Sequence, residues 1–209
     1  MIFALDLEGV LAPEIWPILG AHFDLPDLSL TTRDIGDFLE LMHRRVAATR
    51  SRPVTLAALQ AVAHGVEPYL GAREFLSRLR AMGQVVIISD TFHELSEPLV
   101  QKLGGHCLFA NQFELDTYGL LKGFKLRIRG RKERIVSGFR SAGYGVAAMG
   151  DSLNDRSLLA GCDYPVLYRP VAALRTEFPQ APVAVNLDEA LELIIAAWRR
   201  EQDNDRAVD

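Results

Sequence analysis

Three short apolar runs, each stopped by polar residues, constrain the fold of this 209-residue chain more than any other feature. The runs occupy residues 2–7, 85–88 and 146–149, and stretches with helical periodicity separate them. Buried strands of a parallel sheet have this near-continuous apolar character, and their alternation with helices is typical of α/β proteins. We therefore predict a doubly wound, mainly parallel, Rossmann-like sheet, with weaker strand candidates at residues 107–109 and 165–167.

Residues 14–68 interrupt this alternation because they carry helical periods and no strand pattern. One apolar stripe follows Thr31 and Thr32, which are expected to cap its helix, and a second stripe follows Thr55. Open α/β sheets bind ligands at the carboxyl edge of their strands. An all-helical insertion directly after the first strand is therefore expected to form a cap over that edge.

The remaining segments complete the expected organisation. Residues 1–13 and 69–201 are predicted to form the catalytic core that the 14–68 cap covers. Within the core, residues 113–128 contain an internal turn signal and predict a small β-hairpin. Residues 202–209 are polar and aperiodic, so we expect them to form a flexible C-terminal tail.

The composition narrows the classes of partner. Lys and Arg number 23 and Asp and Glu number 27, which gives a net charge of −4 without a polybasic stretch. This balance disfavours nucleic acid or an anionic membrane as a partner, and two cysteines are too few for a disulfide framework. No apolar run approaches the roughly 20 residues that span a bilayer, and the N-terminus lacks the pattern of a signal peptide. We expect a cytoplasmic protein that binds a small molecule, and a homodimer is compatible with these observations.

Two carboxylates lie two residues apart where the first strand is expected to end. Taken alone, Asp6 and Glu8 are explained most simply as solvated acids at a strand end. Their functional interpretation is a nucleophile, Asp6, that forms an acyl-phosphate beside Glu8, which acts first as general acid and then as base. Gly9 follows them and permits a sharp turn of the backbone.

A more specific pattern, GDSLND at residues 150–155, follows the third apolar run. In a parallel sheet the strand ends lie side by side, so Asp6, Ser89 and Asp151 are expected to share one pocket. Two carboxylates in such a pocket repel each other unless a cation lies between them, and their hard oxygens favour Mg²⁺. The sequence therefore predicts a magnesium site at this edge.

Two further residues fit a phosphate site, although each has a simpler explanation. Ser89 could donate its hydroxyl to a phosphate oxygen, or it could cap a helix. Lys132 stands among several arginines, most of which are expected to be solvated. One cation is nevertheless needed to neutralise a phosphoryl group in an acidic pocket, and a lysine at a helix start can reach inward.

The chain resembles the haloacid dehalogenase superfamily of phosphohydrolases through four motifs in the expected order: Asp6-x-Glu8-Gly9-Val10, Ser89, Lys132 and Gly150-Asp151-Ser152-x-Asn154-Asp155. The resemblance covers nearly the whole chain, and the helical insertion matches the phosphoserine phosphatase branch. Residues 5–11, 13–16, 31–35 and 89–92 are most similar to its bifunctional phosphoserine phosphatase/homoserine phosphotransferases. That subgroup shares Glu8, where most of the superfamily has Asp, and the Ser89-Asp90-Thr91 run.

This resemblance implies a role for each motif residue. Asp6 would attack phosphorus, and Glu8 would protonate the leaving alkoxide. Mg²⁺ would be held by Asp6, the backbone carbonyl of Glu8 and Asp151. The phosphate oxygens would be held by Ser89, Lys132 and Asn154, and Asp155 would orient the metal waters and Lys132.

The resemblance also implies how phosphoserine is recognised. Arg45 would bind the carboxylate, Glu14 would accept the ammonium, and Phe38 would pack over the ligand. Otherwise Phe38 would belong to the apolar core and Arg45 to a solvated helix face. Asp90 is placed among the substrate-binding residues as well. L-Homoserine would replace water as phosphoryl acceptor, because it carries the same carboxylate and ammonium groups as serine.

Two alternatives remain open at this point. One is a phosphatase of another small phosphometabolite, such as a sugar phosphate or a thioether-ketose phosphate. The other is a receiver-type phospho-acceptor module, which also combines an Asp, a Ser or Thr and a Lys on a doubly wound sheet. Such a module has neither the helical insertion nor the fourth motif, so the phosphatase interpretation is favoured.

Overall fold

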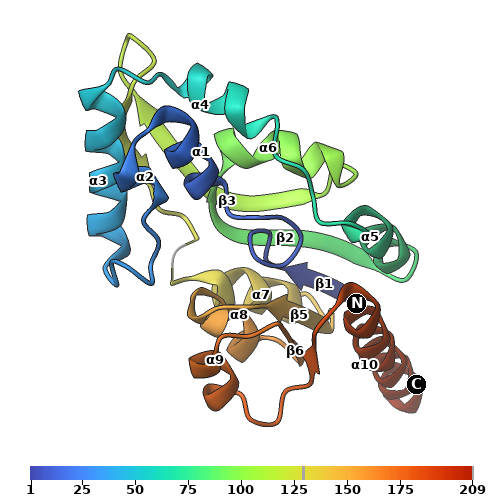
Figure 1. Ribbon diagram of the computed structural model, residues 1–209. Coiled ribbons are helices and arrows are strands. Elements are labelled where there is room, and N and C mark those ends of the chain that lie inside the picture. The colour runs from blue at the N-terminus through green and yellow to red at the C-terminus, as the bar shows by residue number, and fades with distance from the viewer. Residues whose placement is uncertain (129, 209) are drawn as a thin grey trace.

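A central sheet organises the structure, a computed structural model that describes residues 1–128 and 130–208 (Figure 1). In this part of the chain the sheet has seven strands in the order β4-β3-β2-β1-β5-β6-β7. The strands are β1 (Ile2–Leu5), β2 (Gln84–Phe92), β3 (Cys107–Leu115), β4 (Leu121–Lys125), β5 (Val146–Gly150), β6 (Tyr164–Tyr168) and β7 (Val183–Ala184). All neighbouring pairs are parallel except β3 and β4, which confirms the predicted mainly parallel α/β sheet. The two weaker strand candidates are parts of β3 and β6.

Helices alternate with these strands and cover the sheet (Figure 1). Within the described residues they are α1 (Ile15–Phe23), α2 (Pro26–Ser29), α3 (Phe38–Ser51), α4 (Leu56–Ala63), α5 (Ala72–Arg80), α6 (His93–Lys102), α7 (Lys132–Ser141), the 3₁₀ turn η1 (Leu153–Asp155), α8 (Arg156–Gly161), α9 (Ala172–Glu177) and α10 (Leu187–Val208).

The central strand β1 shows why both faces of the sheet are covered. Its side chains alternate, so that Ile2 and Ala4 pack in one apolar cluster and Phe3 and Leu5 in the other. Helices α7, α8 and α9 contribute side chains to the first cluster, whereas α5, α6 and α10 contribute to the second. None of these four β1 side chains is more than 4% exposed, so the doubly wound arrangement is confirmed.

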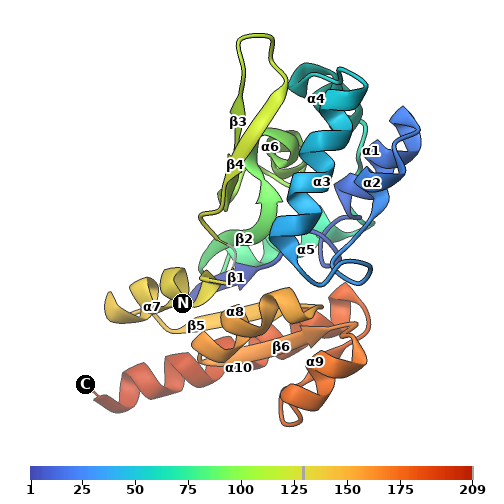
Figure 2. The same cartoon turned by 90° about the vertical axis from the view of Figure 1, so that its left-hand side faces the viewer.

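Helices α1–α4 occupy the chain between β1 and α5, where the sequence predicts only helices. Figures 1 and 2 show them grouped together beside the β3–β4 hairpin. Their buried side chains, among them Trp16, Met42 and Leu59, belong to the same apolar cluster as Phe3 of the sheet. These helices therefore pack onto the sheet layer through a continuous core, and their treatment as a separate domain at residues 14–68 stays a prediction.

The start of α3 differs from the expectation. The helix begins at Phe38, and Asp37 caps it by accepting a hydrogen bond from the backbone N of Leu39 at 2.8 Å. Thr31 instead belongs to a turn, in which its backbone N and its Oγ1 donate to Asp34 Oδ2 at 2.8 and 2.9 Å. The predicted threonine cap was wrong because Asp34 engages Thr31 locally and leaves Asp37 to satisfy the first free N–H groups of α3.

The predicted β-hairpin is confirmed by the antiparallel pairing of β3 and β4. The hairpin also contacts the helices beside it (Figure 2). Arg50 of α3 donates to Asp116 Oδ2 at 2.8 Å, and the backbone N of Leu56 in α4 donates to the carbonyl oxygen of Gly119 at 2.9 Å. These contacts join the hairpin turn to helices α3 and α4.

The C-terminal segment is helical where the sequence predicts a flexible tail. Helix α10 continues through residues 202–208, and residue 209 lies outside the described part of the chain. The helical conformation of this segment was not predicted from its polar, aperiodic composition, and its flexibility stays a prediction. Residues 187–209 contain neither proline nor glycine, so nothing in the local sequence stops the backbone hydrogen bonds of the helix from continuing.

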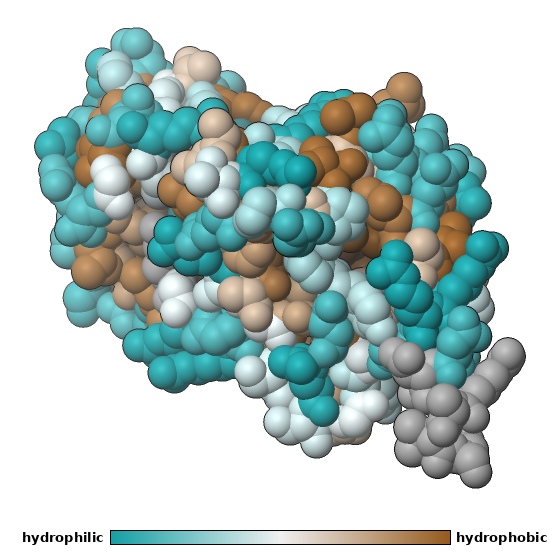
Figure 3. Space-filling model, turned by 90° about the horizontal axis from the view of Figure 1, so that it is seen from below, coloured by the Kyte–Doolittle hydropathy of each residue, from teal (hydrophilic) through white to brown (hydrophobic). Residues whose placement is uncertain are grey.

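Hydrophilic and apolar side chains are intermixed on the face shown in Figure 3. Among the described residues, no helix combines the length and apolar character needed to cross a membrane. The apolar side chains of this chain are used mainly for packing the two sheet faces.

Candidate active site

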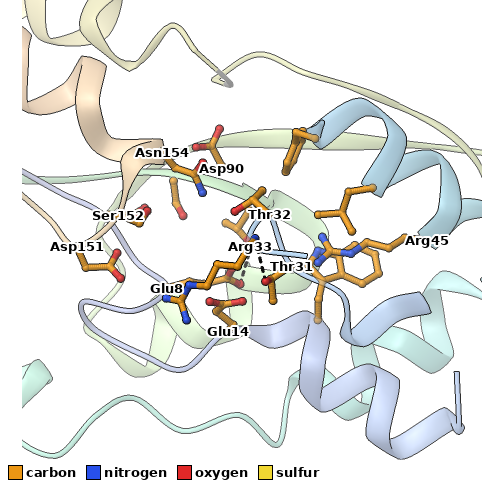
Figure 4. Close-up of a pocket in the computed structure, with 16 residues that line it drawn as sticks. Glu8, Glu14, Thr31, Thr32, Arg33, Arg45, Asp90, Asp151, Ser152 and Asn154 are labelled. Atoms are coloured by element: carbon orange, nitrogen blue, oxygen red, sulfur yellow. Dashed lines mark hydrogen bonds between the residues drawn. The ribbon is translucent and has the colours of Figure 1, made fainter. Parts of the chain in front are cut away.

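A pocket lies where the carboxyl ends of β1, β2 and β5 meet, beside helices α1 and α3 (Figure 4). Asp6 and Glu8 come directly after β1, and Asp151 comes directly after β5. Ser89 and Asp90 come from the last part of β2. The structure therefore brings together five of the predicted site residues from three separate regions of the sequence.

The end of β2 is shaped by an irregularity in its pairing with β3. The register shifts between Ile88 and Phe92, so the intervening residues leave the regular ladder. A bulge of this kind re-aims side chains at the edge of a sheet. Ser89, Asp90 and Thr91 thereby all line the pocket.

Gly9 allows the segment after β1 to approach the segment after β5. Its φ is +84°, a conformation that residues with a side chain rarely adopt. A Cβ atom at this position would lie 2.6 Å from Asp151 Oδ2. Glycine is therefore required both for the turn and for the space that the Asp151 carboxylate occupies.

Lys132, the first residue of α7, lies fully buried behind these carboxylates. Its Nζ lies 2.8 Å from Asp155 Oδ1, 3.2 Å from Asp6 Oδ1 and 3.6 Å from Asp90 Oδ2. Burial opposes the ammonium charge, but the surrounding carboxylates outweigh it and raise the pKa of Lys132. Lys132 is thus a permanent cation at the base of the site.

Asp155 connects Lys132 to the loop after β5. Its Oδ2 accepts hydrogen bonds from the backbone N of Asp151 at 3.0 Å and of Ser152 at 3.2 Å, while its Oδ1 accepts from Lys132. Both carboxylate oxygens are therefore engaged within the protein. This arrangement suits a residue that positions its neighbours, which is the role that the family resemblance implies for Asp155.

Three carboxylates form a group that could hold a divalent cation. Asp6, Asp151 and Asp155 each present an oxygen, and these oxygens all lie within 4.8 Å of one another. Burial, and then the charge of Asp155, raise the pKa of Asp6 well above its usual value and that of Asp151 to about 7. A cation between the carboxylates would remove this repulsion, and their oxygens suit Mg²⁺. Because both oxygens of Asp155 are already engaged, Asp6 and Asp151 are the carboxylates of this group that could hold the ion, and the backbone carbonyl of Glu8 stays a predicted third ligand.

Glu8 lies in the same pocket with the features of a general acid. Burial is the main cause that raises the pKa of its carboxyl group to about 7. Its Oε1 accepts a hydrogen bond from Thr91 Oγ1 at 3.2 Å and a longer one from the backbone N of Ile15 at 3.4 Å. A carboxyl group with this pKa can both donate and accept a proton near neutral pH.

Arg45 of α3 lies at the side of the pocket opposite Asp151 (Figure 4). Its side chain is buried, with Nη2 donating to the carbonyl oxygen of Leu30 at 2.6 Å and Cζ lying 4.4 Å from the ring centroid of Trp16. Burial lowers the pKa of Arg45 to about 10, whereas Glu8 and Glu14 oppose that shift. The guanidinium therefore stays charged, and its buried Nε has no hydrogen-bond partner among the described residues.

The other predicted substrate residues also line this pocket. Glu14 precedes α1 and is half-buried, and Asn154 reaches the pocket from η1. Phe38 is 9% exposed and both belongs to the apolar core and lines the pocket, so the two interpretations of this residue are compatible.

Comparison with known proteins assigns the chain to a family. Residues 2–163 match the family model of the haloacid dehalogenase-like hydrolases. The chain belongs to this family. A phosphoserine phosphatase of Pseudomonas syringae pv. tomato is 38% identical over 200 residues, which cover 96% of this chain and 84% of the relative. The phosphoserine phosphatase ThrH of Pseudomonas aeruginosa is 39% identical over 191 residues, or 91% and 93% of the two chains.

Solved structures of phosphoserine phosphatases share the fold. A substrate-bound phosphoserine phosphatase has a TM-score of 0.77 at 17% identity, with 91% of this chain and 96% of that chain covered. A phosphoserine phosphatase from T. onnurineus has a TM-score of 0.69 at 23% identity, with 92% and 93% covered. The predicted family and fold are thereby confirmed.

Several pocket residues of this haloacid dehalogenase-like hydrolase were missed in the sequence. They are Trp16, Thr31, Thr32, Arg33, Leu41, Thr91 and Ser152. All of them except Leu41 stand in the runs that resemble the family, at residues 13–16, 31–35, 89–92 and 150–155, but no role in the pocket was predicted for them. Thr31 and Thr32 were interpreted as a helix cap, and Leu41 has the ordinary periodicity of a core residue.

Proposed function

We propose that this chain is a Mg²⁺-dependent phosphomonoesterase that hydrolyses O-phospho-L-serine through an aspartyl-phosphate at Asp6. One observation carries the proposal: a single pocket joins the acidic pair Asp6 and Glu8 to Arg45 and Glu14. The first pair suits phosphoryl transfer, and the second pair suits the carboxylate and ammonium of an amino acid. The names of both Pseudomonas relatives support this substrate.

In the first step, an Asp6 oxygen attacks phosphorus and the bond from phosphorus to the serine oxygen breaks. Lys132 favours the charged, nucleophilic form of Asp6, since its Nζ lies 3.2 Å from Oδ1. Glu8 donates its proton to the departing serine oxygen, which its raised pKa of about 7 permits near neutral pH. The products are L-serine and a phosphorylated Asp6.

In the second step, Glu8 accepts a proton from water, and the water oxygen forms a bond to phosphorus. The bond between phosphorus and the Asp6 oxygen breaks, which releases phosphate and restores both carboxyl groups. Ser89 and Asn154 line the pocket, and they would donate hydrogen bonds to the phosphate oxygens. When bound by Asp6 and Asp151, Mg²⁺ would supply positive charge that offsets the negative charge of the phosphoryl group.

The same site would accept L-homoserine in place of water. Homoserine offers the carboxylate and ammonium that Arg45 and Glu14 would bind, and its hydroxyl is one methylene farther away than that of serine. Glu8 would remove the hydroxyl proton as it does for water. Binding next to the aspartyl-phosphate gives the alcohol a high effective concentration.

A screen of phosphorylated metabolites with Mg²⁺ tests the hydrolase, with phosphoserine, sugar phosphates and a thioether-ketose phosphate as substrates. Phosphoserine should give the highest kcat/KM, and a clear preference for another compound would replace it as the substrate. Asp6→Asn should remain folded without turnover, because an amide does not attack phosphorus. The match to a hydrolase family already disfavours a receiver-type module, and multiple turnovers would exclude it.

Phosphorus NMR with phosphoserine and increasing homoserine tests the transferase. O-Phosphohomoserine should appear at the expense of inorganic phosphate. If saturating homoserine yields inorganic phosphate alone, the transferase proposal is wrong while the hydrolase proposal stands.

A further inference from the structure

A second arginine, Arg33, lines the pocket and has no role in the mechanism above. It lies between α2 and α3, and its side chain is exposed, in contrast to the buried Arg45. These two arginines are the cations among the described pocket-lining residues, which also include five carboxylates. A ligand with both a phosphate and a carboxylate therefore meets one arginine that is fixed and one that is accessible.

The backbone around Arg33 is held by a compact turn. Asp34 Oδ2 accepts hydrogen bonds from the backbone N and the Oγ1 of Thr31, at 2.8 and 2.9 Å. The backbone N of Arg33 donates to Thr31 Oγ1 at 3.2 Å. These hydrogen bonds hold the backbone at Arg33, and none of them involves its guanidinium.

The direction of the side chain places it at the phosphoryl end of the pocket. Figure 4 shows Arg33 extended toward the side of Asp151, with Arg45 on the opposite side. Arg33 and Asp151 both line this pocket. Asp151 follows β5 directly and belongs to the acidic group around Asp6.

We propose that Arg33 binds an oxygen of the phosphoryl group, both in bound phosphoserine and in phosphorylated Asp6. This inference rests on the proposed function and adds a contact from the helical side of the pocket. Guanidinium groups bind phosphate oxygens through paired hydrogen bonds. Arg33 is exposed in the free protein, so its guanidinium is accessible to an incoming phosphate. Arg33 therefore acts on any phosphate ester, whereas Arg45 acts only on ligands with a carboxylate.

The experiment compares two substrates and one product on the Mg²⁺-loaded protein. Phosphoserine and p-nitrophenyl phosphate report turnover, and calorimetric titration with inorganic phosphate reports binding without turnover. Arg33→Ala should lower kcat/KM for both substrates by a similar factor, about tenfold to a hundredfold, and weaken phosphate binding by about tenfold or more. Arg33→Lys keeps the charge but not the paired donors, so it should recover part of each loss.

Arg44→Ala is the matched control, because it removes an exposed arginine from α3. Arg44 lies 2.7 Å from Glu40 and does not line the pocket, so this variant should resemble the wild type. If Arg33→Ala lowered kcat/KM for phosphoserine alone, the inference would be overturned, because Arg33 would then bind the amino-acid part of the substrate. Unchanged phosphate affinity in Arg33→Ala would overturn it too. Failure of wild-type protein to hydrolyse phosphoserine would reject the proposed function separately, since phosphate binding still reports on Arg33.

Discussion

The ammonium of Lys132 lies 3.2 Å from the carboxylate of Asp6, although 126 residues separate the two in the chain. The same ammonium contacts Asp155 and Asp90, so one buried cation serves three carboxylates. Removal of this charge leaves buried acids without their common counter-ion, which is costly in a protein interior.

Lys132→Met should therefore lower the free energy of unfolding by about 3–5 kcal/mol at neutral pH and remove turnover. Urea unfolding followed by circular dichroism measures the stability, and a phosphoserine assay measures turnover. Lys122→Met changes the same residue type on β4, away from the pocket, and should have little effect on either. Equal stabilities for the Lys132 variant and the wild type would contradict the role of this ion cluster.

Arg45→Ala should affect phosphoserine more than an aryl phosphate. The variant removes a charge-assisted contact to the substrate carboxylate. The fall in kcat/KM for phosphoserine should therefore correspond to a loss of about 2 kcal/mol or more of transition-state stabilisation. p-Nitrophenyl phosphate has no carboxylate, and its kcat/KM should change little. Equal losses on both substrates would show that Arg45, packed on Trp16 and bonded to Leu30, serves structure or catalysis instead.

The raised pKa of Glu8 predicts a pH dependence that differs between leaving groups. Glu8 must carry a proton to assist departure of serine, so kcat/KM for phosphoserine should fall as pH rises above about 7. p-Nitrophenol leaves as a stable anion, so its ester should show a much weaker fall. In Glu8→Gln, p-nitrophenyl phosphate should give one rapid equivalent of p-nitrophenol followed by slow turnover, because no base remains for the water. Identical pH profiles for the two esters would argue against this acid.

The raised pKa of Asp151 links stability, pH and magnesium. Because its folded pKa of about 7 exceeds the usual 3.8, the folded protein binds more protons than the unfolded chain between these values. Stability without metal should therefore fall as pH rises from about 4 to 7, with up to about 4 kcal/mol from this residue. At about pH 8, Asp151→Asn should be more stable than the wild type without Mg²⁺, whereas Mg²⁺ should stabilise only the wild type.

Chemical unfolding with and without Mg²⁺ measures both effects. Asp188→Asn, an exposed acid on α10, is the matched control and should behave as the wild type does. Mg²⁺ stabilisation that persists fully in Asp151→Asn would show that Asp151 is not one of the groups that hold the ion.

Much of the fold could be predicted because its strands are buried on both faces. Residues 2–5 and 146–149 have no polar interruption, and Asp6 and Asp151 follow at the sheet edge where ligands bind. Competition between neighbouring residues for the same backbone groups was harder to predict, and so was the point at which a helix ends. The choice between Thr31 and Asp37 as a helix cap depends on Asp34, and continuation of α10 past residue 201 depends on backbone propagation that a polar composition conceals.

The residues of the candidate site also divide into those that could be predicted from the sequence and those that could not. Asp6, Ser89 and Asp151 could be predicted to meet because parallel strands end at one edge of the sheet. The turn at Gly9 could be predicted because glycine permits a sharp bend of the backbone. Arg33 and Trp16 stand in runs that resemble the family, but their place in the pocket could not be predicted, since it depends on how helices α1 and α3 pack above the sheet. Three-dimensional packing of this kind leaves no periodic trace in the sequence.

The strand order has a consequence for synthesis of the chain on the ribosome. Strand β1 emerges first, yet it lies in the middle of the sheet and needs β5, at Val146–Gly150, to cover its second edge. A nascent chain that ends before β5 therefore presents an unpaired, apolar strand edge, which is the kind of surface that aggregates or recruits chaperones. Because Asp6 also obtains Lys132 and Asp151 only from the later part of the chain, the nucleophile has no complete set of neighbours until the segment through Asp151 has been synthesised.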